Sequence, residues 1–97
     1  MPRRIHGQVM SVTDAGNLVT DITAEQLRDA PRDESVAIRC DEHETRGIFG
    51  RDHGEPESTF LAILDPDGTL ELEIVGVSAS LMLGIRVGDQ VVVEWEG

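Results

Sequence analysis

Apolar side chains at alternate positions are the feature that most restricts the fold of this chain. Four stretches enriched in branched residues show this spacing of two, which places their apolar side chains on one face of an extended strand. Polar clusters of Gly, Asn, Asp and Pro follow these stretches, and such clusters are typical of turns. The pattern predicts short, half-buried strands joined by tight turns.

The same alternation, followed along the whole chain, predicts seven extended segments. They cover residues 5–12, 18–22, 36–40, 44–49, 59–64, 70–75 and 91–95. A small sheet of this kind leaves exposed edges unless it closes on itself, because closure pairs every edge strand. We therefore predict a mainly β fold, a small closed or partly open β-barrel with two short helices, and a single domain over residues 1–97.

Helix-capping residues occur in two places. Thr23 and Gln26 form a capping-box pattern, in which each side chain satisfies a backbone N–H near the other residue, and Pro31 ends the segment because it has no N–H. Farther along, Ser78 can cap a helix, and Gly84 can take the left-handed conformation after the last turn. We expect one short helix between Thr23 and Pro31 and a second between Ser78 and Gly84.

Charge and composition exclude several classes of function. The chain has 19 acidic residues against 8 basic residues, a formal net charge of −11, which repels nucleic-acid phosphates and anionic lipids. Two Phe, one Trp and no Tyr leave little surface on which bases can stack. A single cysteine, Cys40, and the lack of an apolar signal or spanning segment favour a cytoplasmic location. We expect neither nucleic acid nor membrane as a partner.

Metal-ligating and catalytic side chains form only weak patterns. Cys40 and His43 have the spacing of two ligands on a turn, but structural zinc needs two such pairs, and His53 lies in a polar loop at residues 50–58. The carboxylates within residues 41–44 are typical of a solvated hairpin tip. The sequence contains no Ser-His-acid order, phosphate-binding Gly-rich loop or HExxH motif. We expect no metal site and no catalytic residue.

Two longer segments carry more specific information. Residues 7–22 read GQVMSVTDAGNLVTDI, and residues 68–85 read GTLELEIVGVSASLMLGI, followed by GDQV at residues 88–91. They resemble the C-terminal domain of the S-adenosyl-L-methionine hydroxide adenosyltransferases, a family that includes the fluorinating and chlorinating enzymes. There the segments read approximately GxVxxVDRFGNLVTNI, GYLEIAVNGGSAAELLGL and GDxV. Order, spacing and turn residues agree, and a looser match extends through the middle of the chain.

The resemblance implies a β-barrel-like domain that normally follows a larger N-terminal domain. In the family the two domains meet across a trimer interface and enclose S-adenosyl-L-methionine. The N-terminal domain positions the water or halide that attacks the C5′ carbon of ribose and carries the residues that activate water. A chain that starts at the barrel is therefore expected not to perform this reaction on its own.

The resemblance also implies three ligand positions, Asn17, Gly76 and Thr13. Asn17 matches the family Asn whose side-chain amide recognises adenine. An amide both donates and accepts hydrogen bonds, which suits the edge of adenine. Gly76 falls where a backbone group also meets adenine. Thr13 stands where the family has an Asp that helps to hold the methionine ammonium, and Asp14 follows it. The alternative for Asn17 is a purely conformational role, because Gly-Asn is common in turns.

Other positions depart from the family pattern in ways that oppose ligand binding. Ala15 replaces an aromatic residue and so removes a packing surface. Pro66 occupies the position of a family Ser that helps to bind the methionine part of the ligand. Proline has neither a hydroxyl nor an N–H to donate. Asp67 replaces an Arg found in some members, and its carboxylate would repel the ligand carboxylate.

These observations lead to one leading hypothesis and two alternatives. The leading hypothesis is a non-catalytic, stand-alone domain used for interaction or self-association, with a protein partner or a second copy and no cofactor. The first alternative is a split subunit that completes an S-adenosyl-L-methionine site on a separately encoded catalytic domain. The second alternative is a lone sensor that binds adenosine or S-adenosyl-L-methionine.

Overall fold

One curved sheet of eight strands forms the body of the protein. The structure is a computed structural model that describes residues 2–65 and 68–96. The strands are β1 (Pro2–Val12), β2 (Leu18–Thr23), β3 (Ala37–Cys40), β4 (His43–Arg46), β5 (Ile48–Phe49), β6 (Phe60–Leu64), β7 (Thr69–Ile74) and β8 (Gln90–Glu96). Their order in the sheet is β4-β3-β8-β1-β2-β7-β6-β5. Only the pair β5 and β6 is parallel among the described strand pairs.

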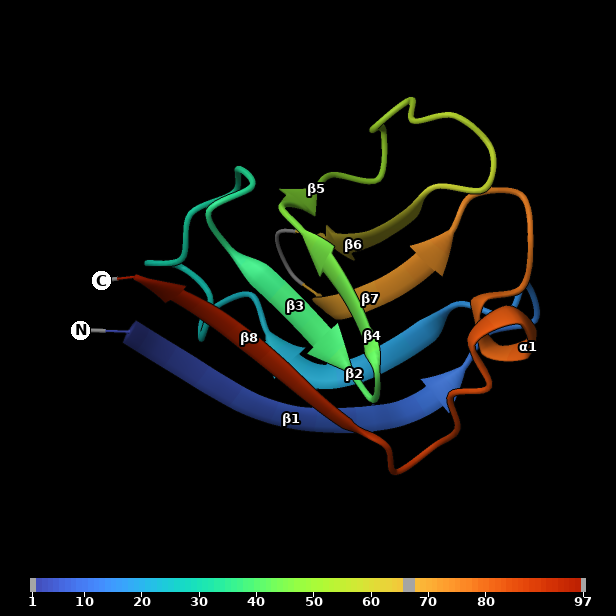
Figure 1. Ribbon diagram of the computed structural model, residues 1–97, viewed down its shortest axis with the longest axis horizontal. Coiled ribbons are helices and arrows are strands. Elements are labelled where there is room, and N and C mark those ends of the chain that lie inside the picture. Colours follow the sequence, from blue (N-terminus) through green and yellow to red (C-terminus); the bar gives the residue numbers. More distant parts are fainter. Residues whose placement is uncertain (1, 66–67, 97) are drawn as a thin grey trace.

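The sheet curls until its two ends approach each other, as Figure 1 shows. Near this seam, the Thr45 hydroxyl of β4 donates a hydrogen bond to the Phe60 carbonyl oxygen of β6, over 2.8 Å. A nearly closed barrel results, and the prediction of a mainly β, barrel-like fold is confirmed. Among the described residues, however, the barrel carries one short helix, not the two that we predicted.

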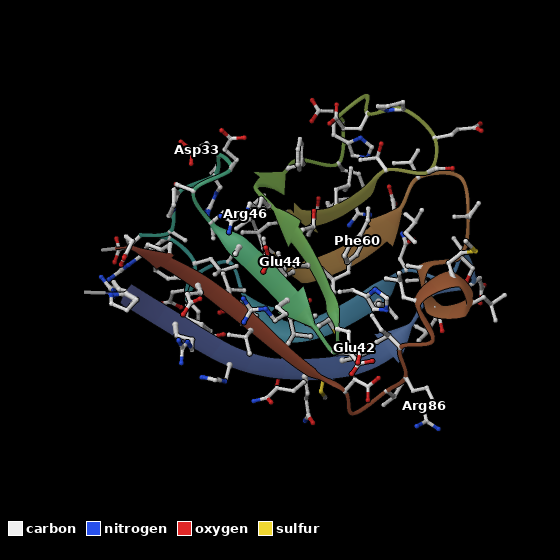
Figure 2. The ribbon with its side chains drawn as sticks, in the orientation of Figure 1. Asp33, Glu42, Glu44, Arg46, Phe60 and Arg86 are labelled. Carbon is white, nitrogen blue, oxygen red and sulfur yellow. The ribbon has the colours of Figure 1, made fainter. Side chains whose placement is uncertain are left out.

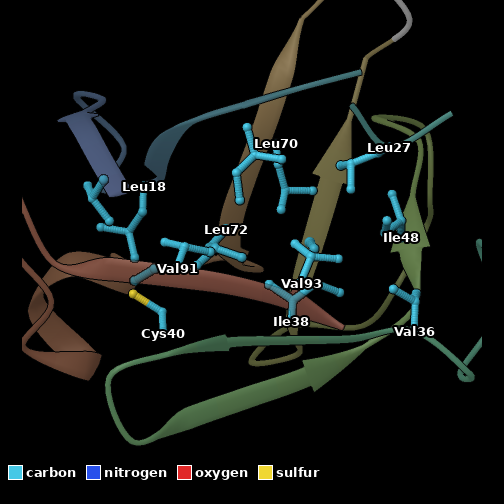
Figure 3. Packing of buried hydrophobic residues seen from close by; sticks show 14 of the residues in the cluster. Leu18, Leu27, Val36, Ile38, Cys40, Ile48, Leu70, Leu72, Val91 and Val93 are labelled. Carbon is cyan, nitrogen blue, oxygen red and sulfur yellow. The ribbon is translucent and has the colours of Figure 1, made fainter. Parts of the chain in front are cut away.

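Alternation of apolar side chains places the core inside the barrel. In β7 and β8 every second residue is buried, and Val91, Val93 and Trp95 of β8 point inward as predicted. Buried side chains from the other strands complete the cluster, among them Ile38 and Leu72 (Figure 3). The long antiparallel pair of β1 and β8 runs without a register shift from Pro2↔Glu96 to Gln8↔Gln90 and forms one wall of the barrel.

The segment from Thr23 to Pro31 is a run of turns, so the prediction of a helix there was wrong. The capping box itself is present: the Thr23 N–H donates to Gln26 Oε1 over 2.9 Å, and the Gln26 N–H donates to Thr23 Oγ1 over 3.2 Å. The bonds that follow, such as Ala30 N–H to the Leu27 carbonyl, span three residues and not four. Leu27 and Ala30 are buried in the core from this run of turns, so packing overrides the local capping signal.

The second capping pattern does form a helix, α1 (Ala79–Leu83). The Ser78 hydroxyl accepts a hydrogen bond from the Leu81 N–H over 3.2 Å, and Gly84 takes the left-handed conformation with φ of 68°. Both capping predictions are confirmed at this site. None of the helices within residues 2–65 and 68–96 has the length and apolar content needed to cross a bilayer.

One predicted strand is divided in the structure, and one predicted hairpin is only partly described. The extended segment at residues 44–49 is divided at Gly47 into β4 and β5, which pair with different neighbours. The hairpin expected at residues 65–68 joins β6 to β7, but Pro66 and Asp67 lie outside the described residues. What the resemblance implies for these two positions therefore stays a prediction.

Candidate functional site

Two segments that are far apart in the sequence meet at one end of the barrel. The turn between β1 and β2 and the chain that leads from β7 to α1 enclose a hollow of about 360 Å³. It is lined by Ala15, Asn17, Glu73, Ile74, Gly76, Val77 and Ser78. Two of the three candidate ligand residues, Asn17 and Gly76, therefore line the same hollow.

Thr13 stabilises the turn that presents Asn17. The Asn17 N–H donates to Thr13 Oγ1 over 3.0 Å, and the Thr13 N–H donates to the Asn17 carbonyl over 2.9 Å. The Thr13 hydroxyl is thus engaged inside the turn. Within the part of the chain that the structure describes, Thr13 is not one of the residues that line the hollow.

The turn and α1 are joined at Gly16. The Ser80 N–H of α1 donates to the Gly16 carbonyl over 3.0 Å. Gly16 has a φ of +90°, and a Cβ added there would lie 2.0 Å from the Ser78 hydroxyl oxygen. Only Gly permits both this conformation and this close approach. Asn17 and α1 are consequently held as one rigid unit.

Glu73 of β7 contacts Asn17 directly and was missed by the sequence analysis. Asn17 Nδ2 donates to Glu73 Oε1 over 3.0 Å. The other carboxylate oxygen, Oε2, lies 3.3 Å from His53 Nε2, and His53 Nδ1 accepts the Glu55 N–H over 2.9 Å. Because Nδ1 is an acceptor, Nε2 carries the proton that is donated to Glu73. The family motif has Ala where Glu73 stands.

The loop at residues 50–58 is fastened to the outer face of β7 beside the hollow. Arg51 Nη2 lies 2.7 Å from Asp65 Oδ2 and 2.7 Å from Glu71 Oε2, and the Ser58 N–H donates to the Val75 carbonyl over 2.8 Å. Hydrogen bonding to Arg51 lowers the pKa of Asp65, and the same contacts raise the pKa of Arg51. The alternation in β7 places Glu71 and Glu73 on the same outward face, so their exposure on this face, although not their partners, was predictable from the sequence.

Cys40 and His43 occupy the other hairpin, β3–β4. Cys40 is almost fully buried, and burial raises the pKa of its thiol to about 11, with nearby Asp89 and Asp41 adding to the effect. His43 Nε2 lies 3.1 Å from the Leu83 carbonyl oxygen. Across the residues that the structure describes, no three His, Cys, Asp or Glu side chains are grouped so that they could hold a metal ion.

Apolar side chains are exposed beside the hollow. Leu81 and Met82 of α1 are 85% and 67% exposed, and Val77, which also lines the hollow, is 39% exposed. We call these three residues the α1 patch. Figure 1 shows α1 at the end of the barrel where β1 also ends. Large apolar side chains grouped on a surface mark sites of contact with other molecules.

The chemistry of the hollow is that of binding. It offers an amide, a carboxylate and a hydroxyl, with Ile74 and Val77 as apolar surface. The hydroxyl, on Ser78, caps α1. The wall at Ala15 lacks the aromatic surface that the family motif has at this position. The polar groups can hydrogen-bond to a small ligand, and the apolar side chains can pack against its ring.

Comparisons with known proteins identify relatives of both sequence and fold. Residues 7–92 match the family described as the SAM hydroxide adenosyltransferase C-terminal domain. No curated protein matches the chain. A solved structure of an uncharacterized conserved protein from Thermotoga maritima has a TM-score of 0.76 and 24% sequence identity, covering 93% of this chain and 35% of that chain.

A second solved structure shows the same fold. It is a conserved hypothetical protein from Thermus thermophilus, with a TM-score of 0.67 and 23% identity, covering 89% of this chain and 33% of that chain. The chain described here therefore spans about a third of the length of both solved proteins. At this level of identity the two likenesses show a shared fold.

Proposed function

The chain belongs to the SAM hydroxide adenosyltransferase C-terminal domain family, and from this premise we propose that it is a non-catalytic interaction domain that docks on another protein domain through the α1 patch. The observation that carries the proposal is the exposure of Leu81 and Met82 on a helix that is otherwise firmly anchored. Exposed Met and Leu on a rigid support are typical of surfaces that bind other proteins.

Charge favours a different protein over a second copy as the partner. The formal net charge of −11 makes two copies repel each other. Several basic side chains are already paired with acids, among them Arg4 with Glu94 and Arg39 with Glu44. Acidic side chains such as Glu42 project freely from the barrel, as Figure 2 shows. We therefore expect a partner with an apolar centre and a basic rim.

The resemblance names the kind of domain that fits this description. In the family, the barrel contacts a larger N-terminal domain, and we propose that the partner is a domain of that type. The non-catalytic assignment is supported by the site itself. Among the described residues that line the hollow, the Asn17 amide donates to Glu73 and the Ser78 hydroxyl caps α1. Release of adenosine from S-adenosyl-L-methionine by the purified chain alone would overturn this assignment.

The docking proposal is tested by binding of the purified chain to the N-terminal domain of a family member. We expect the double variant Leu81→Ser/Met82→Ser to lose affinity by about tenfold or more, because each substitution removes apolar contact area. Met10→Ser, a change at an exposed methionine of β1, is the matched control and should bind like the wild type. Affinity should also fall with added salt.

Two results would contradict the docking proposal. One is binding that the α1 double variant leaves unchanged. The other is self-association of the wild-type chain in sedimentation experiments that the same variant abolishes, because the patch would then bind a second copy. The two variants should have similar melting temperatures, which separates a loss of binding from a loss of folding.

A second candidate function is favoured by the position of the hollow. Asn17 and Gly76 line a hollow that shares Val77 with the α1 patch, so a docked partner would also cover the hollow. We propose that the two proteins together complete an adenosine or S-adenosyl-L-methionine site. Ligand and partner should then each raise the affinity for the other by the same factor, and Asn17→Ala should abolish this coupling.

Thermal melts distinguish a composite site from a lone sensor. A ligand that binds only the folded chain, present at a hundred times its dissociation constant, adds about 2.7 kcal/mol to the free energy of unfolding. That corresponds to a rise of roughly 10 °C or more in melting temperature for a domain of this size. A rise with adenosine or S-adenosyl-L-methionine alone would favour the sensor, and a rise only with the partner present would favour the composite site.

A further inference from the structure

We propose that Glu73 is a specificity-determining residue that fixes the orientation of the Asn17 amide, so that the hollow selects ligands with an amino group over ligands with a carbonyl group. The inference rests on the second candidate function, in which the hollow binds a nucleoside. It concerns the selection between nucleosides and assigns Glu73 a role that acts through Asn17.

The carboxylate decides which way the Asn17 amide faces. A carboxylate only accepts hydrogen bonds, so the group 3.0 Å from Glu73 Oε1 must be the NH2 of Asn17. The other terminal atom of the planar amide is therefore the oxygen Oδ1. Among the described residues, no donor reaches Oδ1, and no buried side-chain N or O lacks a partner. The oxygen is therefore accessible and free to accept a hydrogen bond from a ligand.

The carboxylate is itself held in place from the other side. His53 Nε2 donates to Glu73 Oε2, and the Glu55 N–H fixes the histidine ring through Nδ1. The side chains of His53 and Glu73 are 10% and 19% exposed, and the His53 ring also packs edge-on against Phe49. Three segments of the chain, the turn before β2, β7 and the loop at residues 50–58, thus converge on one carboxylate. A side chain held at both oxygens cannot easily turn to release Asn17.

This orientation defines the ligand chemistry that the hollow accepts. Asn17 presents an acceptor, Oδ1, beside the second N–H of its amide, which can still donate. The matching ligand has an amino group next to a ring nitrogen, as adenine has, whereas a 6-oxopurine presents a carbonyl oxygen in place of the amino group. The carboxylate also disfavours anionic ligands in the same hollow. An uncharged or cationic aminopurine nucleoside meets both conditions.

Titration of the purified full chain with adenosine and with inosine, both alone and with the partner domain present, tests the inference. The two probes differ at the amino or carbonyl position, and NMR of the Asn17 side-chain amide reports binding directly. We expect adenosine to bind the wild type about tenfold or more tighter than inosine. In Glu73→Gln the ratio should fall toward one, because a glutamine side chain can donate as well as accept and so permits either amide orientation.

Glu71→Gln is the matched control. Glu71 lies on the same outward face of β7 and also contacts a basic side chain of the loop, but its hydrogen bond is to Arg51 and not to Asn17. This variant removes the same charge and should keep the wild-type ratio. A loss of folding would lower both affinities together and leave their ratio unchanged, so the ratio separates specificity from stability.

Each result has a distinct meaning. If Glu73→Gln keeps the preference for adenosine, the role of Glu73 is refuted while the nucleoside hollow stands. If the wild type prefers inosine or binds the two equally, the orientation inferred for Asn17 is wrong. If neither nucleoside binds the wild type, either alone or with the partner domain present, both this inference and the nucleoside hollow are overturned, whereas docking through the α1 patch, which is measured without a nucleoside, is not.

Discussion

Leu72 on β7 and Leu81 on α1 are the same side chain in opposite surroundings. Leu72 is fully buried inside the barrel, whereas Leu81 is 85% exposed. Leu72 follows the period-two pattern that turns apolar side chains toward the core. Leu81 lies on a helix of which only Ala79 is buried. The comparison teaches that apolar residues in the barrel wall stabilise the fold, whereas those of the α1 patch are available to a partner.

The helix keeps its place by backbone and capping bonds. The Ser80 N–H reaches the Gly16 carbonyl, the Ser78 hydroxyl caps the first turn, and the Gly84 N–H reaches the Ser80 carbonyl over 3.0 Å. Most helices in proteins depend on burying an apolar face. Here hydrogen bonds orient the helix together with the packing of Ala79 and Leu83 on the core, and Leu81 and Met82 remain exposed.

The largest effect is expected from truncating the buried leucine. Leu72→Ala should lower the free energy of unfolding by about 2–5 kcal/mol, because it removes buried methyl groups and leaves a cavity. The melting temperature should fall by roughly 10 °C or more. Leu81→Ala is the matched substitution and should change stability by less than about 0.5 kcal/mol. Denaturant unfolding followed by the fluorescence of Trp95 measures both. Similar losses of stability for the two variants would contradict the conclusion that the barrel wall stabilises the fold and the α1 patch does not.

An intermediate effect is expected where the turn meets α1. Gly16→Ala should cost about 1–3 kcal/mol, because a side chain is strained at positive φ and its Cβ would collide with Ser78. Gly84→Ala shares the strain, with φ of 68°, but its Cβ would meet no atom within 4 Å. The difference between the stability losses of the two variants measures the contribution of the steric collision with Ser78. Equal losses in thermal melts would show that the close packing of the turn on α1 contributes nothing.

The two capping patterns show how far local sequence determined local structure. Both caps form as predicted, at Thr23 and at Ser78, yet only the second is followed by an α-helix. The difference lies in tertiary contacts, since α1 is tied to Gly16, whereas Leu27 and Ala30 reach the core from a series of turns. A capping motif predicts where a helix can begin, but packing decides whether it continues.

The candidate site was predictable only in part, because its contacts also depend on tertiary structure. Asn17 and Gly76 came from the resemblance, and the hollow brings them together. Nothing in the spacing of Asn17 and Glu73 along the chain indicated that they touch, because their contact depends on which strands are neighbours in the sheet. The outward alternation of β7 did place Glu73 on the surface beside the turn. The sequence suggested for His53 only a role as a metal ligand, whereas in the structure its Nε2 hydrogen-bonds to Glu73.

A smaller effect is expected when the buried thiol of the wall is ionised. Burial raises the pKa of Cys40 to about 11 from 9.0, so the folded chain keeps a proton that the unfolded chain loses above pH 9. The stability that this contributes is present below pH 9 and is lost as the pH rises toward 11. The chain has neither Lys nor Tyr, the other side chains that would titrate in this range. The melting temperature should therefore fall between about pH 8.5 and about pH 10.5, the range over which the unfolded thiol ionises first.

Cys40→Ala is the control for this alkaline loss. The variant is less stable at neutral pH because it leaves a small cavity, but its melting temperature should vary less between the same two pH values. Native Cys40 should also react slowly with thiol reagents, because it is 1% exposed and its thiolate is disfavoured. Rapid labelling of the folded chain would contradict this expectation, because it would show that the wall opens readily.

The smallest effect is expected at the surface contacts of the loop at residues 50–58. Arg51 holds the pKa of Asp65 below its usual value of 3.8, so this contact stabilises the fold above that pH and the contribution is lost as the pH falls through the lowered value. Both side chains are largely exposed, and pairs of this kind contribute little and are screened by salt. Arg51→Ala should therefore lower the melting temperature slightly at neutral pH, and the difference from the wild type should shrink in acid and in salt. A difference that persists under both conditions would mean that Arg51 acts through packing on β7, which would place the loop with the barrel wall in the comparison.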